Sequence, residues 1–248
     1  MILPGWVPIF LREMFLFRRR IFRLGYLFSA MATPVIYLIA FGLGLGHRVR
    51  MEGTDYLAFL IPGLAGMSSM FNSYSWLASS MNLNRIYFKT FQVFVQAPIH
   101  PLSILVGEVL AGVIKGLFAS SLIIAVGLVT SPAFHLTPIF LLVLLLNCFL
   151  FAGLGVIAGM VSKSHEDTAT YSNLFIMPMA FFSGTFFPLD RFPEFLKSLI
   201  RILPLTHTNI LIRKEYLDGE AITSLAVLLV YTVVFIIYGA QLIKRYSE

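Results

Sequence analysis

Charge and cysteine are both scarce in this chain. Only 12% of its 248 residues are charged, whereas 58% are hydrophobic, and Cys148 is the single cysteine. Soluble domains carry roughly 25% charged residues, so this composition excludes an ordinary soluble globular domain. One cysteine has no partner within the chain, which excludes a scaffold held by disulfides. Because Cys148 lies inside an apolar run, we expect it to serve as a small packing residue.

The sequence also lacks the motifs that usually carry chemistry. The pattern G-x-x-x-x-G-K-[ST], whose backbone cradles nucleotide phosphates, does not occur. No group of His, Cys and Glu has the spacing of metal ligands, and the run 165–167 (His-Glu-Asp) has the character of a solvated turn. No pair of residues on a plausible face could serve as acid and base. We therefore expect no enzyme activity, no metal site and no cofactor in this chain.

Long apolar runs are what the sequence has in abundance. A helix needs about 20 mostly apolar residues to cross a hydrocarbon core of roughly 30 Å. Six segments meet that requirement, and they are residues 27–46, 56–80, 102–130, 137–160, 169–187 and 222–243. We found no repeat or linker between them. The sequence predicts an all-α membrane protein, in which residues 1–248 form one domain and residues 27–248 supply six transmembrane helices.

Residues 1–26 predict an interfacial helix. One face carries apolar residues at spacings of three and four, and the other carries arginines. The two faces are Trp6, Phe10, Met14, Phe17 and Ile21, and Arg12, Arg19, Arg20 and Arg23. An amphipathic helix of this kind lies in the membrane surface, with its apolar face in the acyl boundary and its arginines toward phosphates.

Basic residues set the expected orientation. With six spans, both termini lie on one side, and that side carries the larger share of Lys and Arg in its loops and ends. The positive-inside rule therefore predicts that both termini are cytoplasmic. The formal net charge of +6 is then expected to face anionic lipid headgroups rather than nucleic acid.

A short amphipathic helix is predicted on the cytoplasmic side, over residues 85–94. Asn82 and Asn84 are candidate N-caps, and Pro98 and Pro101 would end the segment. Its polar and aromatic sides are Arg85, Lys89, Gln92 and Gln96, and Tyr87, Phe91 and Phe94. Two interpretations remain open: a docking surface for a soluble partner, or a connector that lies on the membrane surface.

On the opposite side, residues 188–220 predict short helices between spans five and six. Pro193 can open a helix in its first turn, and Pro204 is expected to stop it. A second run covers residues 210–217. Both are too short to span a membrane, so we expect interfacial or re-entrant pieces.

Two ionisable residues, Glu108 and Lys115, fall inside the third predicted span. They are seven residues apart, hence on one face and about 10 Å apart along the helix. Each should therefore find a partner on another helix or in a wet cavity. The two residues either belong to a substrate path or gate, or simply stabilise helix packing.

Several short motifs carry a resemblance to a known family. They are the runs 56–63 (YLAFLIPG), 96–99 (QAPI), 182–189 (FSGTFFPL) and 203–207 (LPLTH), together with Pro193 and Arg213. Their order around six spans resembles the type-2 permeases of ATP-binding-cassette (ABC) exporters, especially the nodulation-type lipo-oligosaccharide and drug-resistance permeases. Gln92 is a departure, since such proteins often carry an acidic residue there.

The resemblance implies a permease subunit in a bacterial inner membrane, paired with a second copy of itself and with two cytoplasmic ABC ATPase subunits. Those subunits would hold the ATP and Mg. Residues 85–94 would be the coupling helix that meets the ATPase, and the residues implied are Arg85, Tyr87, Phe88, Lys89, Phe91 and Gln92. An amphipathic cargo such as a glycolipid, polysaccharide or drug would leave along a seam between the two copies. The candidate seam residues are Asn72, Tyr74, Asn173 and Phe182. The alternatives are an ion-coupled secondary transporter and a membrane assembly subunit that transports nothing.

Overall fold

A computed structural model describes residues 4–22, 32, 34–44 and 55–247, and every regular element in them is helical. The elements are α1 (Trp6–Ile21), η1 (Leu38–Leu43), α3 (Tyr56–Ile86), α4 (Thr90–Gln96), α5 (Pro101–Thr130), α6 (Pro138–Val161), α7 (His165–Tyr171), η2 (Ser172–Ile176), α8 (Met177–Phe182), η3 (Leu189–Arg191), α9 (Glu194–Ile200), α10 (Pro204–Leu211) and α11 (Gly219–Ser247). The all-α prediction is confirmed over this part of the chain. Among the described helices α5, α6 and α11 are long and apolar enough to cross a membrane.

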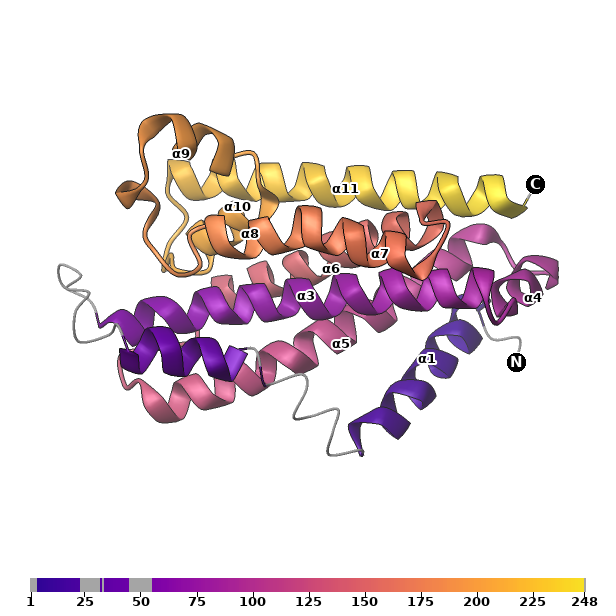
Figure 1. Cartoon of the computed structure of the whole chain (residues 1–248), viewed down its shortest axis with the longest axis horizontal. Helices are drawn as coiled ribbons and strands as arrows, with labels where there is room; N and C mark the ends of the chain where they lie inside the picture. The colour runs from indigo at the N-terminus through magenta and orange to yellow at the C-terminus, as the bar shows by residue number, and fades with distance from the viewer. Residues whose placement is uncertain (1–3, 23–31, 33, 45–54, 248) are drawn as a thin grey trace.

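The long helices form a bundle around α3 (Figure 1). α3 packs against α5 and α6, and α11 lies along α6 and α5. Small residues let these backbones approach closely, as is usual between membrane helices. A Cβ on Gly155 of α6, for example, would lie only 2.7 Å from the carbonyl oxygen of Tyr74 in α3. Cys148 is fully buried in this bundle, as expected for a packing residue.

The fifth predicted span, 169–187, is a broken helix with different ends. It begins at His165, where Ser164 and Asp167 form a reciprocal capping box. Its middle, η2, has the wide turns of a π-helix and lies directly before Pro178, whose ring disfavours a regular helix. The helix ends at Phe182. Residues 183–187 are therefore not helical, contrary to the prediction.

The segment between α8 and α11 contains the short 3-10 helix η3 and two short α-helices. Two short helices were predicted here, but the second was misplaced. Pro193 directly precedes α9, and Pro204 occupies the first turn of α10. Pro204 was expected to stop the first of these helices, but α9 already ends at Ile200. Pro204 instead begins α10, because a proline in the first turn loses no hydrogen bond. The expected run 210–217 is wrong, since α10 ends at Leu211. Of the first predicted span, 27–46, residues 34–44 are described and are helical.

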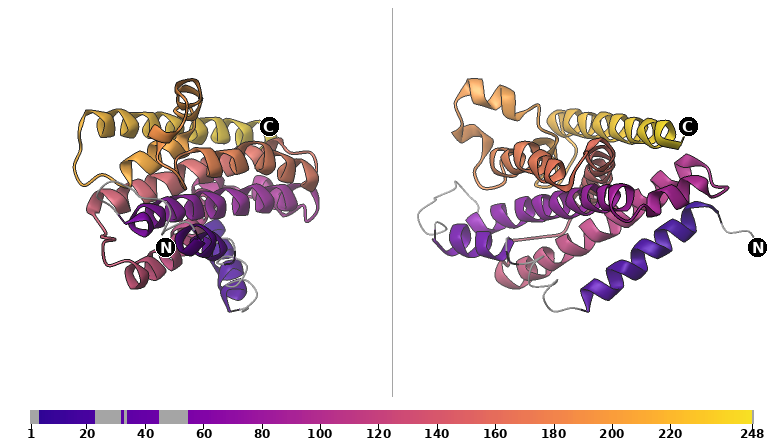
Figure 2. Two further views of the ribbon diagram at one scale, coloured as in Figure 1. Left: turned by 60° about the vertical axis from the view of Figure 1, so that its left-hand side comes forward. Right: turned by 45° about the vertical axis from the view of Figure 1, so that its right-hand side comes forward.

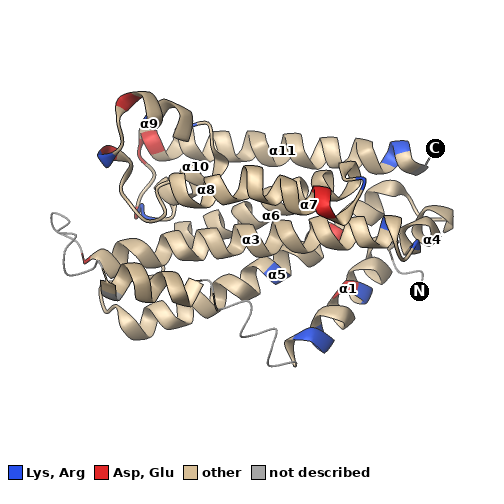
Figure 3. Ribbon diagram, viewed as in Figure 1, with Lys and Arg blue, Asp and Glu red and all other residues tan. Residues whose placement is uncertain are grey.

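Most charged residues lie toward the two ends of the bundle (Figure 3), and α1 begins at the same end where α11 finishes (Figure 1 and the right-hand view of Figure 2). α1 packs against α5 at that end. Its buried face consists of Ile9, Glu13 and Phe17, which is turned from the predicted apolar face around Phe10 and Met14. The difference arises because Glu13 has a partner inside the bundle, described below.

Candidate functional site

The predicted cytoplasmic helix is shorter and starts later than its sequence suggested. α3 continues to Ile86, so Arg85 lies in its last turn and the proposed N-caps Asn82 and Asn84 are helix-interior residues. The chain then turns at Lys89, whose φ of 53° is left-handed, and α4 begins at Thr90. The prediction of one helix over 85–94 is therefore wrong. The turn and α4 together form the connection between α3 and α5.

The aromatic residues that this connection exposes match the predicted aromatic side, Tyr87, Phe91 and Phe94, only in part. Tyr87, Phe88 and Val93 are 60%, 66% and 63% exposed, and Lys89 is also exposed. Phe91 is fully buried among residues of α3, α5 and α11. We call Tyr87, Phe88, Lys89 and Val93 the docking patch. It is an apolar and cationic surface at the end of the bundle.

Arg85 and Gln92 point into the protein. The Arg85 guanidinium donates to the carbonyl oxygens of Gly159 and Ser162 at the end of α6. The Gln92 side-chain amide donates to the carbonyl oxygen of Arg85 and to the hydroxyl oxygen of Tyr246, each at 3.0 Å. Gln92 therefore fixes α4 to α3 and α11, and Arg85 fixes the end of α3 to α6. The sequence alone did not reveal either contact.

α1 holds the start of α4 through Asn84. The Asn84 side-chain oxygen accepts hydrogen bonds from the Thr90 hydroxyl at 3.0 Å and from the Arg12 guanidinium at 3.2 Å. The Arg12 guanidinium also lies 5.3 Å from the centre of the Phe94 ring, within reach of a cation–π contact. α4 is thus held by α1 as well as by α3 and α11.

A buried ion pair joins α1 to the bundle. The Lys115 ammonium donates to a carboxylate oxygen of Glu13 at 2.7 Å, and the Trp76 indole N–H donates to the same oxygen at 3.2 Å. The ammonium lies 4.0 Å from the centre of the Trp76 ring. The expectation that Lys115 has a partner on another helix is confirmed. Glu13 was missed, although its place four residues after Ile9 and four before Phe17 put it on their face.

Glu108 differs from Lys115. It is fully buried, and neither carboxyl oxygen has a hydrogen-bond partner in the described part of the chain. The partner expected from the sequence is therefore not found there. Its charged neighbours are Glu13, Lys115 and Arg12, so all four groups belong to the junction between α1 and α5.

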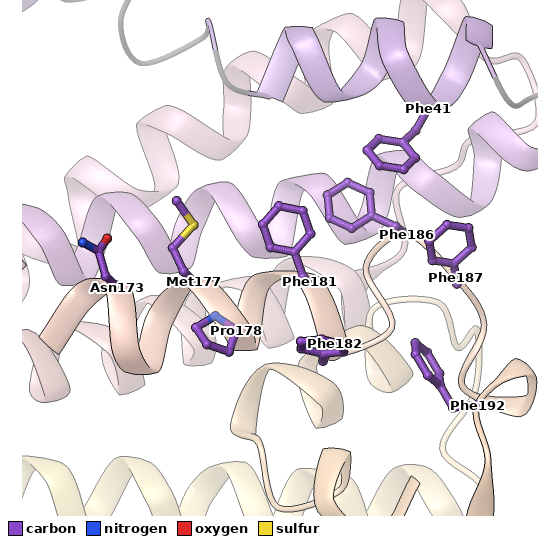
Figure 4. Close-up of a pocket in the computed structure, with 9 residues that line it drawn as sticks. All are labelled: Phe41, Asn173, Met177, Pro178, Phe181, Phe182, Phe186, Phe187 and Phe192. Carbon is purple, nitrogen blue, oxygen red and sulfur yellow. The ribbon is translucent and has the colours of Figure 1, made fainter. Parts of the chain in front are cut away.

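A cavity of about 480 Å³ opens beside the broken fifth helix (Figure 4). Phenylalanines supply most of its wall, and its lining residues are Phe41, Asn173, Met177, Pro178, Phe181, Phe182, Phe186, Phe187 and Phe192. In Figure 4 the rings of Phe41, Phe181 and Phe186 lie close together; those of Phe41 and Phe186 are 4.5 Å apart, centre to centre. We call this the aromatic cavity.

The four candidate seam residues do not share one surface. Asn173 and Phe182 both line the aromatic cavity. Asn72 lines a separate cleft between α1 and α3. Tyr74 is buried beside a third hollow, which is lined mainly by α6 and by other residues of the broken fifth helix. The structure therefore brings together the two residues from the fifth helix but not the two from α3.

Arg213 joins three segments at the end of the bundle opposite the termini. Its guanidinium donates to the carbonyl oxygens of Phe59 in α3 at 3.2 Å, Asn209 in α10 at 3.2 Å and Thr185 at 3.3 Å. It also stacks on the Phe59 ring at 3.8 Å. A Cβ on Gly63 would lie 2.7 Å from this guanidinium, so glycine makes room for it. The motif 182–189 and Arg213, noted separately in the sequence, belong to one contact.

Comparison with known proteins identifies the family. Residues 9–217 match the model of the ABC-2 type transporter family. The chain is 30% identical to the inner membrane transport permease YadH of Escherichia coli K12 over 218 residues, which is 86% of this chain and 85% of that protein. It is 29% identical to nodulation protein J of Rhizobium leguminosarum bv. viciae, over 97% of this chain and 94% of that protein. The chain belongs to the ABC-2 type transporter family and is a membrane subunit of an ABC transporter.

Proposed function

We propose that the chain is the permease subunit of an ABC exporter, with six spans and both termini in the cytoplasm. Two copies would pair with two separate ATPase subunits, which hold the ATP and Mg. The match of residues 9–217 to the family carries this proposal. The absence of the phosphate-binding pattern from the sequence supports a separate source of ATP hydrolysis.

The docking patch is the proposed contact with the ATPase. It lies at the end of the bundle where the termini and α4 are found (Figure 1), and its exposed rings and Lys89 suit a groove with apolar and acidic residues. Gln92 faces inward, so its lack of an acidic charge does not weaken this contact. Arg85 is likewise a support of α4 rather than a contact residue in this proposal.

Co-purification with a candidate ABC ATPase subunit tests the contact. We expect Phe88→Asp to lose most of the bound ATPase, because a desolvated carboxylate would replace an apolar anchor. Phe195→Asp is the matched control, since Phe195 is 72% exposed on α9 at the opposite end. Equal ATPase recovery with both variants would refute docking at α4.

The aromatic cavity is the proposed route for an amphipathic cargo such as a glycolipid, polysaccharide or drug. Its phenylalanines would hold an apolar part, while Asn173 offers an amide to a polar part. A photo-crosslinker at position 182 should capture cargo in living cells, and one at exposed Val129 of α5 should not. Equal capture at both positions would remove the cavity from the route.

The rival proposal of an ion-coupled transporter is supported by the buried carboxyl of Glu108, which has no hydrogen-bond partner among the residues that the structure describes. Purified chain alone in liposomes distinguishes the two. Cargo movement driven by a proton or sodium gradient, without ATPase, would overturn the ABC exporter proposal. We expect movement only with the ATPase and ATP present.

A further inference from the structure

The last helix, α11, makes contact with α4 through its final turn. The ring of Tyr246 lies 5.3 Å from that of Phe91, edge to face, and its hydroxyl accepts a hydrogen bond from Gln92 at 3.0 Å. The Arg85 guanidinium lies 5.9 Å from the same ring. Tyr246 therefore touches both α4 and the end of α3 from which α4 departs.

The N-terminal half of α11 is joined to α10 and to the segment between α9 and α10. The Tyr231 hydroxyl donates to the carbonyl oxygen of Ile202 at 2.8 Å. His207 has one ring nitrogen 2.8 Å from the carbonyl oxygen of Arg201 and the other 3.2 Å from the Ser224 hydroxyl. Because a carbonyl only accepts, the first nitrogen must donate, and the second then accepts from Ser224. α11 thus has polar contacts with the segment that joins α9 to α10.

The body of α11 is suited to carry a displacement between these two ends. It is one continuous helix of 29 residues, about 43 Å long at 1.5 Å per residue. No proline interrupts it, and α helices bend sharply at prolines or inserted groups rather than elsewhere. It runs the length of the bundle between α9 and the end that holds α4 (Figures 1 and 2).

We infer that α11 transmits movement of α4 to α9 and α10, and that Tyr246 is the positioning residue that connects α4 to α11. The inference rests on the proposed function, in which an ATPase moves α4. Phe91 is buried against the Tyr246 ring and Gln92 is bonded to its hydroxyl. α4 therefore cannot shift relative to α11 without losing both contacts, and moving the two together preserves them.

A fluorescent label on α9 tests the inference in the complex of full-length chain and ATPase. Ser198 is exposed on α9, so Ser198→Cys can carry bimane, whereas the native Cys148 is buried. Emission is compared in the nucleotide-free complex and in the complex trapped with ATP and vanadate. We expect trapping to change the emission in the parent. Tyr246→Phe should shift the equilibrium between the two emission states about fivefold, as loss of one hydrogen bond predicts, and Tyr246→Ala should abolish the change.

Tyr238→Phe is the matched control, because Tyr238 is exposed on the same helix and should leave the emission change as in the parent. Every variant must also bind the ATPase and hydrolyse ATP at the parent rate, which a general loss of folding would not allow. A full emission change in Tyr246→Ala, or none in the parent, would overturn the inference while the complex still forms. Failure of the ATPase to bind the parent chain would instead refute the proposed function on which the inference rests.

Discussion

Removing one partner of the buried ion pair between Glu13 and Lys115 should destabilise the protein strongly. Both side chains are about 1% exposed, and their charged atoms are 2.7 Å apart. Lys115→Met leaves the Glu13 carboxylate buried without its ammonium, a change that typically costs about 3–5 kcal/mol. The Trp76 indole and the Arg12 guanidinium still donate to Glu13, so we expect a value at the lower end of that range.

The double variant should recover most of the loss. Glu13→Gln with Lys115→Met removes both charges together, and replacing a whole buried pair is often nearly neutral. The sum of the single losses should therefore exceed the loss in the double variant by several kcal/mol, which a double-mutant cycle measures directly. Unfolding in mixed micelles with increasing SDS, followed by circular dichroism, gives the unfolding free energies of the parent, the two single variants and the double variant.

The matched control is an ion pair at the surface. Lys197 and Glu194 are also 2.7 Å apart, but Glu194 is 88% exposed, so Lys197→Met should change the unfolding free energy little. Single variants of the buried pair that are no less stable than this control would refute the argument. Additive losses in the double variant would also refute it, since they would mean that the two charges do not stabilise each other.

Three further variants test other contacts. Gly155→Val should lower the unfolding free energy by about 1–3 kcal/mol through overpacking, because its Cβ would press on the Tyr74 carbonyl oxygen. The same SDS titration measures this loss, and Val161→Ala, at an exposed site on the same helix, is the control. Arg213→Met should lower the unfolding free energy by at least about 1–3 kcal/mol, since carbonyl oxygens including that of Thr185 lose their donor. An unchanged SDS midpoint of unfolding would contradict the idea that Arg213 holds its three segments together. The Lys163 backbone N–H donates a hydrogen bond to the Asp167 carboxylate, which lowers the pKa of that carboxyl from its ordinary value of 3.8. Because Asp167 is therefore ionised at neutral pH, the first turn of α7 should be protected from hydrogen exchange there. This protection should be lost as pH falls through that lowered pKa, and Asp167→Asn should remove this dependence.

The sequence correctly predicted the helices that consist of long apolar runs. It mispredicted helix ends that depend on individual side-chain contacts. The predicted spans 102–130 and 137–160 lie within a residue of α5 and α6, because prolines and polar turns bound both runs. By contrast, α3 runs past Asn82 and Asn84, whose side chains bond to the distant residues Ser162 and Arg12 instead of capping a helix. Helix-capping preference is local and cannot register such partners.

In the candidate site, too, the directions of several side chains depend on contacts with segments far away in sequence. Tyr87 and Phe88 are exposed because they lie in the turn before α4, a stretch that the sequence analysis predicted as helix. The inward direction of Arg85 and Gln92 depends on α6 and α11, which are far away in sequence. Glu13 was assigned no role from the sequence, because its partner Lys115 lies 102 residues further along the chain. No periodicity within either segment could have joined them.

The wide turns of η2 have a consequence for how the fifth helix can bend. A regular helix must break hydrogen bonds between successive turns before it can change direction, but Pro178 has no N–H to give and the π turns already depart from the regular ladder. The angle between α7 and α8 can therefore change at small energetic expense. Because one wall of the aromatic cavity is built on that joint, a modest pivot there would widen or narrow the space between its rings while every other helix keeps its shape.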